Sequence, residues 1–392
     1  HKKAEDNISE ILRAIEAEKP EYVGLAAFVT DFDAVASLAS EIKKRSSAKI
    51  LVGNAHPSIA PEDFLYAGSP FDIVVRGEGE LTVKDILTKP DTNTDLSGIP
   101  GIAYFENGEV KINRNRKLMD LAECGMPAYH KIDVSWYQRP TKYIIHRLAT
   151  VGAVLYTGRG CPFNCSFCAS NSVWQANDRT SGIPLVRKRP LSHVIDALRI
   201  LQDIYHFDFF YILDDTFGIK EDDISDFCRA YRDSGLKMLW AAETRVNCVR
   251  NGEILELLKS SGCIQLDFGV ETGSPRLLKL ISKTTTVEQT LLAFRLCREH
   301  GLRTFANILL NLPTEHKEDL TMTQTLLAEI KPTFTSIGVT QPYPGTDIYK
   351  HLNKPISKLD YSKLNRMFPA EEYRLGYHDL NLEKLLFSWM RK

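Results

Sequence analysis

The sequence contains no long hydrophobic segment. Its longest apolar runs, residues 23–29 and 308–310, have the length of buried strands, whereas a helix that spans a bilayer needs roughly 20 apolar residues. The first residues are polar and predict a helix rather than a secretory signal. We therefore expect a cytoplasmic protein that has no membrane partner.

The sequence also lacks an excess of charge of either sign. Its 49 lysines and arginines and 50 aspartates and glutamates give a formal net charge of -1 at pH 7. A balanced surface provides no long-range attraction for nucleic acid, so we expect no such partner. Hydrophobic residues make up 43% of the chain, as in folded globular proteins, and 392 residues are too many for one ordinary core.

Cysteines are too few and too unevenly spaced for a disulfide-rich fold. Three of the eight lie between positions 161 and 168, and the others are scattered: Cys124, Cys228, Cys248, Cys263 and Cys297. This distribution predicts one dedicated cysteine site in a reducing compartment.

Short apolar runs alternate with helical periodicity and predict an α/β fold. In residues 1–90 they predict a Rossmann-like parallel sheet, with strands at 22–29, 49–53 and 71–75 and a helix at 33–45. Residues 91–149 contain a hairpin-like stretch at 104–110 together with Pro127 and Pro140, and we expect a linker there.

Residues 150–350 repeat the strand–helix pattern six times, which predicts a partial (β/α)6 TIM-type barrel with its chemistry at the carboxyl ends of the strands. The expected strands are 153–157, 209–213, 238–242, 263–270, 304–310 and 334–339, and the expected helices are 191–205, 222–234, 251–260, 287–300 and 317–330. Residues 351–392 are expected to form a short carboxy-terminal extension.

Cys161, Cys165 and Cys168 follow the first expected barrel strand with the spacing C-x-x-x-C-x-x-C. Four thiolates would complete the coordination of a four-iron cluster, whereas three leave one iron open for a ligand, as open catalytic metal sites do. We expect Gly158 and Gly160 to let the backbone turn tightly around the cluster. The alternative is a zinc knuckle, but no fourth cysteine or histidine follows before the next expected helix.

This motif, with Phe167 before its last cysteine, resembles the radical S-adenosylmethionine (SAM) superfamily. The resemblance covers roughly residues 150–350. In that superfamily the open iron binds the amino and carboxylate groups of SAM, and reduction of the cluster splits SAM to a 5′-deoxyadenosyl radical. The resemblance therefore implies a [4Fe-4S] cluster, SAM and an external reductant such as flavodoxin or ferredoxin.

Polar residues at the ends of the expected barrel strands resemble cofactor-binding positions of that superfamily. Besides Phe167 they are Asp214, Asp215, Glu243, Arg245, Glu271 and Asn307. The resemblance implies that the charged residues bind the amino and carboxylate groups of SAM and that Asn307 contacts its ribose. Residues 214–217 read D-D-T-F rather than the commoner G-G-E, and a helix cap is the alternative role for these aspartates. For the others the alternative is a structural ion pair.

Three segments at the strand ends of the amino-terminal sheet resemble the domain that precedes the barrel in cobalamin-dependent radical SAM enzymes. Their residues are Thr30, Asp31, Phe32, Gly53, Asn54, His56, Pro57, Gly77, Glu78 and Gly79. Ordinary glycine-rich turns are the alternative. The motif D-x-H-x-x-G is absent, so we expect no histidine on cobalt. The segment begins with a helix and lacks the first strand of such a domain, as expected of a chain truncated at its start.

Both cofactors together imply methylation of an unactivated carbon, with methylcobalamin as the methyl donor and a second SAM remethylating the cobalamin. The substrate is expected to be a peptide or protein residue, as in methyl-coenzyme M reductase, or a small molecule. Alternatives are a cobalamin-dependent cyclase, methylation on phosphorus, and a radical methylthiotransferase, which the P-Y-P-G-T turn at 342–346 suggests although the required second cysteine trio is absent. A further alternative is a non-catalytic iron–sulfur or cobalamin sensor. Such a sensor would not need the polar residues at the ends of the barrel strands.

Overall fold

The computed structural model describes residues 4–88, 95–138, 151–180, 182–351 and 375–376. They form two compact units. The first contains the described residues up to 119, with 167–183 and 341–351, and the second contains 120–166, 184–340 and 375–376. Pro140 and nearly all of the expected carboxy-terminal extension lie outside the described residues.

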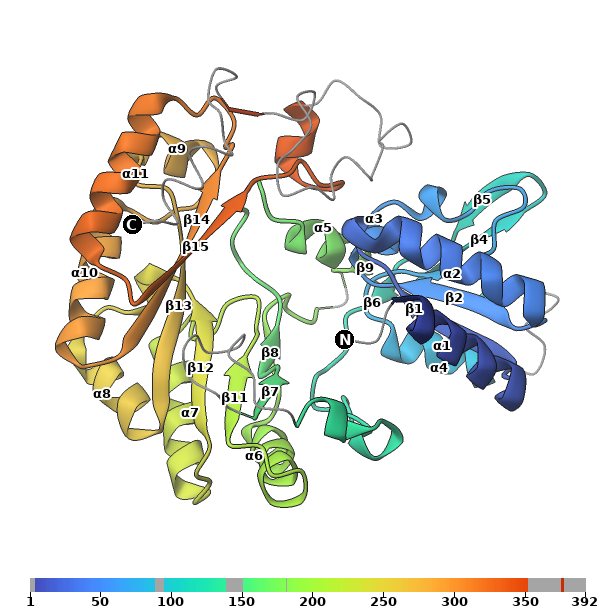
Figure 1. The fold of residues 1–392 in the computed structure, drawn as a ribbon, viewed down its shortest axis with the longest axis horizontal. Coiled ribbons are helices and arrows are strands. Elements are labelled where there is room, and N and C mark those ends of the chain that lie inside the picture. The colour runs from blue at the N-terminus through green and yellow to red at the C-terminus, as the bar shows by residue number, and fades with distance from the viewer. Residues whose placement is uncertain (1–3, 89–94, 139–150, 181, 352–374, 377–392) are drawn as a thin grey trace. The chain divides into compact units, whose positions relative to one another are not determined.

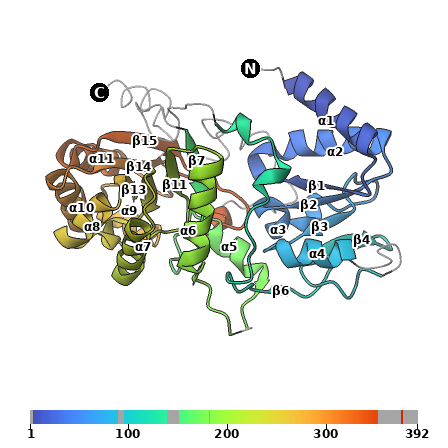
Figure 2. The same ribbon diagram turned by 90° about the horizontal axis from the view of Figure 1, so that it is seen from below.

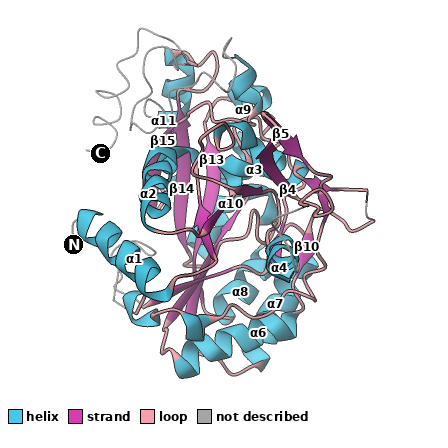
Figure 3. Cartoon of the chain, turned by 90° about the vertical axis from the view of Figure 1, so that its right-hand side faces the viewer, coloured by secondary structure: helices cyan, strands magenta, loops and turns pink. Residues whose placement is uncertain are grey.

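A single sheet organises the first unit. Its described strands run in the order β1 (Tyr22–Ala26), β2 (Lys49–Gly53), β3 (Ile73–Val75), β4 (Ile102–Glu106) and β5 (Glu109–Ile112). The first three are parallel, as predicted, and β4 and β5 are antiparallel. This hairpin, which we expected in a linker after residue 90, instead extends the sheet (Figure 3). Residues 102–104 are all buried, so both faces of β4 pack against other elements. A strand within the sheet meets this condition, whereas an exposed linker does not.

Helices cover both faces of this sheet (Figure 2). On one face α1 (Ala4–Glu18) and α2 (Phe32–Arg45) pack on β2 and β3, through Leu12, Ile15, Ala39, Ile42, Ile50, Val52 and Val74. On the other face Ile86 of α4 (Glu80–Thr88) packs against Leu51, Ile73 and Val75. The shorter elements are α3 (Ala55–Ile59), α5 (Ser170–Gln175), the pair β6 (Arg116–Lys117) and β9 (Asn177–Asp178), and single turns at Val29–Asp31, Pro61–Asp63 and Asp347–His351.

The described part of the second unit is built on a six-stranded, fully parallel sheet (Figure 1). Its order follows the chain: β7 (Gly152–Leu155), β11 (Phe209–Ile212), β12 (Leu239–Thr244), β13 (Cys263–Glu271), β14 (Arg303–Leu310) and β15 (Phe334–Val339). Because β7 and β15 are its two edges, the predicted partial (β/α)6 barrel is confirmed.

The helices of this unit are α6 (Leu191–Arg199), which continues as a π turn over Ile200–Ile204, α7 (Glu221–Asp233), α8 (Gly252–Ser260), α9 (Pro275–Leu280), α10 (Val287–Glu299) and α11 (Lys317–Ile330). All except the six-residue α9 were predicted. A short antiparallel pair, β8 (Gly158–Arg159) with β10 (Arg187–Lys188), stands outside the sheet, and single turns occur at Tyr129–Lys131, Val134–Trp136 and Val246–Cys248. No helix of the described residues is long and apolar enough to cross a membrane.

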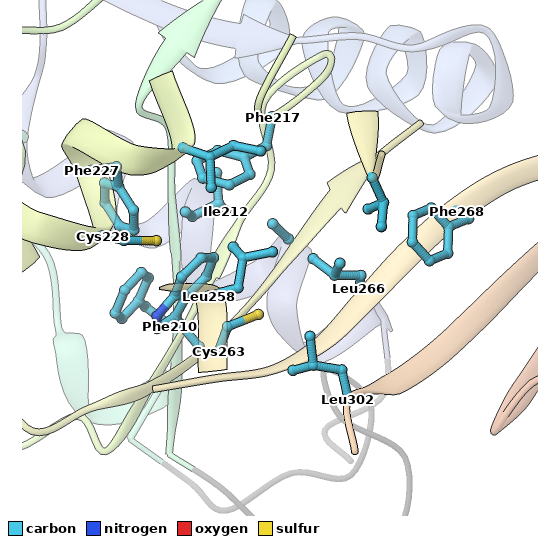
Figure 4. Close-up of a cluster of buried hydrophobic side chains, with 14 of the residues drawn as sticks. Phe210, Ile212, Phe217, Phe227, Cys228, Leu258, Cys263, Leu266, Phe268 and Leu302 are labelled. Atoms are coloured by element: carbon cyan, nitrogen blue, oxygen red, sulfur yellow. The ribbon is translucent and has the colours of Figure 1, made fainter. Parts of the chain in front are cut away.

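Alternation along the strands gives the barrel sheet an apolar face and a mixed face, on which polar residues lie beside Phe209 and Ala241. Residues such as Phe210, Ile212 and Leu266 belong to the cluster beneath the helices that also contains Phe227 and Leu258 (Figure 4). Successive strand residues point to opposite faces, so their neighbours in sequence occupy the face away from the helices, which we call the inner face. Tyr211, Glu243 and Asp267 lie there.

Candidate functional site

Asp214 anchors the loop that leads into the cysteine motif. Its Oδ1 accepts hydrogen bonds from the backbone N–H groups of Thr157, at 2.7 Å, and Gly158, at 3.1 Å. Its Oδ2 accepts one from the Thr157 hydroxyl at 2.5 Å. Burial raises the pKa of Asp214, and these hydrogen bonds oppose the rise. The Asp214 carboxylate, which we predicted to bind SAM, therefore holds the backbone of the loop after β7.

Asp215 and two glycines complete this anchorage. Asp215 is exposed, and its Oδ2 accepts the backbone N–H of Gly160 at 2.9 Å. A Cβ on Gly158 would lie 2.7 Å from the carbonyl oxygen of Arg187, and one on Gly160 would lie 2.2 Å from that of Leu185. The approach of the segment containing β10 therefore requires both glycines, and Gly160 also has φ of 91°, a conformation that favours glycine.

Two motif cysteines lie near a polar side chain in the second unit, and the Thr216 hydroxyl donates its own hydrogen to the Asp215 carbonyl at 2.6 Å. The Cys161 Sγ lies 3.6 Å from the Thr216 hydroxyl, and Arg245 Nη1 donates to the Cys165 Sγ at 3.6 Å. Cys168 and Phe167 fall in the first unit, just before α5. Among the described residues, no three Cys, His, Asp or Glu side chains converge as a preformed metal site.

Arg245 is the side chain that fixes this loop. It is 5% exposed, and its guanidinium carbon lies 3.7 Å from the centre of the Phe163 ring. Nη2 donates to the Lys283 carbonyl and, at 3.1 Å, to the Thr284 hydroxyl. We expected Arg245 to bind a SAM carboxylate. In the structure, its guanidinium instead contacts the cysteine loop.

Glu271 and Lys283 form a buried ion pair of 2.6 Å. Glu271 ends β13 in a left-handed conformation, with φ of 65°, where the pairing of β13 with β14 is irregular. In the structure, Glu271 therefore has the alternative role that we considered for it, that of a structural ion pair. Lys283 was not predicted, because it lies in a loop without a motif.

Glu243 and Asn307 lie on the inner face of the barrel sheet. Asn307 is half-buried in the middle of β14, opposite Gly269 and Ser336. Glu243 is exposed, yet desolvation by the surrounding protein, with the charges of Asp267 and Glu271, raises its pKa to about 6. With Asp215, these are the predicted SAM contacts that the structure leaves open to a ligand.

Three other cysteines of the second unit, Cys228, Cys263 and Cys297, are buried and so differ from the motif cysteines. Burial raises the pKa of Cys228 to about 11 and that of Cys297 to about 12, and Cys263 is raised for the same reason. Such thiols are poor ligands and nucleophiles. Cys161, Cys165 and Cys168 are all only partly buried and not in disulfides. Three partly accessible thiols, one of them hydrogen-bonded by an arginine, suit an iron–sulfur cluster with one open iron.

In the first unit, several predicted cobalamin contacts are core residues. His56 is 1% exposed, its Nε2 lies 2.8 Å from Asp63 Oδ2, and its ring packs between Phe32 and Phe64. Pro57 is also buried. Glu78 is buried too and accepts the backbone N–H of Met119 at 2.9 Å.

Other predicted contacts lie at the carboxyl ends of β1, β2 and β3, which share one edge of the sheet. Thr30 and Asn54 are exposed, and Asp31, Gly53, Gly77 and Gly79 are half-buried. We expected Gly77 to leave room for a macrocycle. Instead, the Asn177 side chain lies 2.6 Å from where its Cβ would be, and Gly77 has φ of 68°. Ligands of open parallel sheets bind at this edge, so these residues suit a cobalamin.

Comparison with known proteins identifies the family. Residues 155–327 match the model of the radical SAM superfamily, and residues 3–87 match that of the B12 binding domain. The chain is 30% identical over 374 residues to an uncharacterized methyltransferase of Pyrococcus horikoshii, covering 94% of this chain and 77% of that protein. The chain belongs to the radical SAM superfamily. Its domains imply a [4Fe-4S] cluster, SAM and cobalamin, as the sequence predicted.

Further relatives of this radical SAM chain include enzymes with different reactions. An anaerobic magnesium-protoporphyrin IX monomethyl ester cyclase of Rubrivivax gelatinosus is 26% identical, over 93% of this chain and 64% of the cyclase. Among solved structures, the radical SAM methyltransferase TsrM of Kitasatospora setae aligns with a TM-score of 0.69 at 18% identity, covering 88% of this chain and 68% of TsrM. That alignment confirms the fold.

Proposed function

We propose that the chain is a cobalamin-dependent radical SAM methyltransferase that transfers a methyl group to an unactivated carbon of a small molecule or a peptide. The observation that carries the proposal is a B12 binding domain preceding a radical SAM barrel in one chain. The relative from Pyrococcus horikoshii, which is named a methyltransferase, supports it. A flavodoxin or ferredoxin is the proposed reductant.

The residues take the following roles in this proposal. Cys161, Cys165 and Cys168 hold the cluster, and Arg245 orients the Cys165 thiolate. Glu243 binds the SAM amino group and Asn307 its ribose. Thr30, Asp31 and Asn54 face the cobalamin at the strand edge of the first unit. When bound, the cluster with SAM supplies radical chemistry and methylcobalamin supplies the methyl group.

Analysis of the SAM-derived products tests this function in the full chain loaded with cluster and cobalamin. A methyltransferase produces both 5′-deoxyadenosine and S-adenosylhomocysteine, because one SAM is cleaved and another gives up its methyl group. Absence of both products would contradict the proposal. Replacing Cys161, Cys165 and Cys168 by Ala should abolish 5′-deoxyadenosine, whereas Cys228→Ala and Cys297→Ala, at buried thiols, are the matched controls.

Cyclisation is the second candidate, because the Rubrivivax gelatinosus cyclase matches 93% of the chain. A cyclase consumes SAM only for hydrogen abstraction, so it releases 5′-deoxyadenosine without stoichiometric S-adenosylhomocysteine. SAM with a deuterated methyl group separates the two: label that reaches the product supports methyl transfer, and unlabelled product supports cyclisation.

A further inference from the structure

The turn after β3 places a cation at the carboxyl edge of the sheet in the first unit. Arg76 directly follows β3, where the parallel strands β1, β2 and β3 end, and ligands of open parallel sheets bind at this edge. Its Nη1 donates to Asn115 Oδ1 at 3.1 Å. Asn115 is held in turn, because its Nδ2 donates to the Gln175 carbonyl at 3.2 Å. The guanidinium is therefore oriented before any ligand binds.

The charge of Arg76 has no carboxylate bound to it within the described part of the chain. The residue is half-buried, and desolvation lowers its pKa, because burial disfavours the charged form. Glu62 is the acidic residue whose charge opposes this shift, but it is exposed and no hydrogen bond joins it to Arg76. A desolvated guanidinium without a bound carboxylate favours an anionic ligand.

Several hydrogen-bond donors at this turn lack an acceptor among the described residues. The Nε of Arg76 is buried and has no partner there, and Nη2 makes no hydrogen bond. Asn177 is 3% exposed, and its Oδ1 accepts the backbone N–H of Glu78 at 3.1 Å, which leaves its buried Nδ2 without a partner. Arg76 and Glu78 flank Gly77, so these donors surround one turn. Their surplus favours a ligand with several acceptor oxygens.

We propose that Arg76 binds the phosphate of the cobalamin nucleotide tail and that Asn115 is the positioning residue that orients its guanidinium. Arginine presents a planar fork of N–H donors that matches the oxygens of a phosphate. The peripheral side chains of cobalamin are neutral amides, so the phosphate is the group that supplies a negative charge. The proposal deepens the proposed function, of which cobalamin is a cofactor, and it adds a residue that the sequence-based set of contacts did not include.

Binding of cobinamide phosphate and of cobinamide to the full chain tests this role, because the two corrinoids differ only in a phosphate. Equilibrium dialysis followed by corrin absorbance gives both dissociation constants. The wild type should bind cobinamide phosphate about tenfold more tightly than cobinamide, because the phosphate adds charge-assisted hydrogen bonds.

Arg76→Gln should bring the ratio of the two constants near unity and leave the constant for cobinamide unchanged, which shows that the site is still folded. Arg76→Lys keeps the charge and should retain part of the ratio. Arg13→Gln, at an exposed position of α1, is the matched control and should behave as the wild type.

Asn115→Asp tests the positioning residue. The variant keeps the acceptor for Nη1 but adds a negative charge beside the guanidinium, so the preference for the phosphate should fall. A preference that stays at the wild-type value would contradict the role of Asn115.

Equal binding of the two corrinoids by the wild type would overturn the proposal, and so would a wild-type ratio in Arg76→Gln. A parallel loss of both affinities in Arg76→Gln would also overturn it, because Arg76 would then be structural. These measurements involve no turnover. A chain that shows the Arg76-dependent preference but transfers no methyl group would therefore support the proposal and contradict the proposed function.

Discussion

At the residue scale, the donor beside Cys165 is a group that would tune a bound cluster. Arg245 places a polar hydrogen near the Cys165 sulfur atom and adds a buried positive charge. Hydrogen bonds to cluster sulfurs and local charge are among the factors that set the reduction potential. A donor stabilises the extra negative charge of the reduced cluster, so it raises that potential.

We therefore predict that Arg245→Gln lowers the midpoint potential of the reconstituted cluster and that Arg245→Lys, which keeps the charge, restores part of it. A redox titration followed by electron paramagnetic resonance measures the shift. Arg229→Gln, at an exposed position of α7, is the matched control. An unchanged potential combined with weaker SAM binding would instead give Arg245 the carboxylate-binding role that the sequence suggested.

Sequence position located the charged residues of the site but not their partners. Asp214, Arg245 and Glu271 all occur at the ends of barrel strands, as predicted, yet each is occupied by backbone groups or by Lys283. The sequence of a strand predicts which face of the sheet a residue occupies and which end of the strand it lies at. It does not predict the residue's hydrogen-bond or ion-pair partner, because that partner belongs to a different loop. Asp267 was detectable, because it and Gln265 are polar residues that alternate with buried apolar ones along β13.

At the element scale, the segment from Gly158 to Gly160 is fixed by its approach to Leu185 and Arg187. Gly160 has φ of 91°, and its Cβ position lies 2.2 Å from a carbonyl oxygen. Gly235, which follows α7, has φ of 73° but nothing within 4 Å of its Cβ position. Comparing alanine substitutions at these two glycines therefore separates the loss of stability caused by backbone strain from the loss caused by a steric clash.

Gly160→Ala should destabilise the barrel by about 3 kcal/mol or more, because strain and clash add. Gly235→Ala should cost only about 1 kcal/mol, because strain acts alone. Thermal unfolding of the two full-length variants gives the comparison. Equal losses would mean that the segment before the cysteines moves away from Leu185 at little cost.

The turn between β14 and α11 contains a buried carboxylic acid. Glu315 is 1% exposed, and its Oε2 accepts the backbone N–H of Asn311 at 2.7 Å. Burial raises the pKa of Glu315 to about 8, although the hydrogen bonds and Arg276 oppose the rise. Because the folded state holds a proton that the unfolded state releases above its ordinary pKa of 4.5, stability falls as pH rises from about 4.5 to about 8.

Glu315→Gln should remove this part of the pH dependence. The variant should match the wild type near about pH 5 and exceed its stability by on the order of 2 kcal/mol near about pH 8. Thermal unfolding at several pH values measures the difference, with Glu318→Gln, exposed on α11, as control. A wild-type slope that persists in Glu315→Gln would place the titrating group elsewhere.

Long elements were predictable from sequence, and short ones were not. The six barrel strands and the helices of nine residues or more around them carry a hydrophobic period, and Gly235, Gly262 and Gly301 each lie between a helix and the next strand. The helices α3, α5 and α9 have five or six residues, too few for a period to emerge. The place of the β4–β5 hairpin also could not be predicted, because pairing with β3 joins residues about 30 apart.

At the scale of the whole molecule, one chain joins a B12 binding domain to a radical SAM barrel. In the first unit the parallel strands β1, β2 and β3 present their carboxyl ends along one edge. His56, the histidine nearest that edge in sequence, is held by Asp63 and two phenylalanine rings. Its imidazole cannot reach a ligand at the edge without breaking the hydrogen bond to Asp63 and leaving the core.

We therefore predict that the full chain binds cobalamin without a histidine on cobalt. The cob(II)alamin form, prepared once with natural-abundance histidine and once with ¹⁵N-histidine, should give identical electron paramagnetic resonance spectra. A protein imidazole on cobalt would change the nitrogen superhyperfine splitting between the two samples, because the two nitrogen isotopes differ in nuclear spin. Such a change would contradict the prediction, and a chain that retains no cobalamin would contradict the cofactor assignment itself. A cobalt without this strong donor favours the four-coordinate cob(I) state, the nucleophile that remethylation by a second SAM requires.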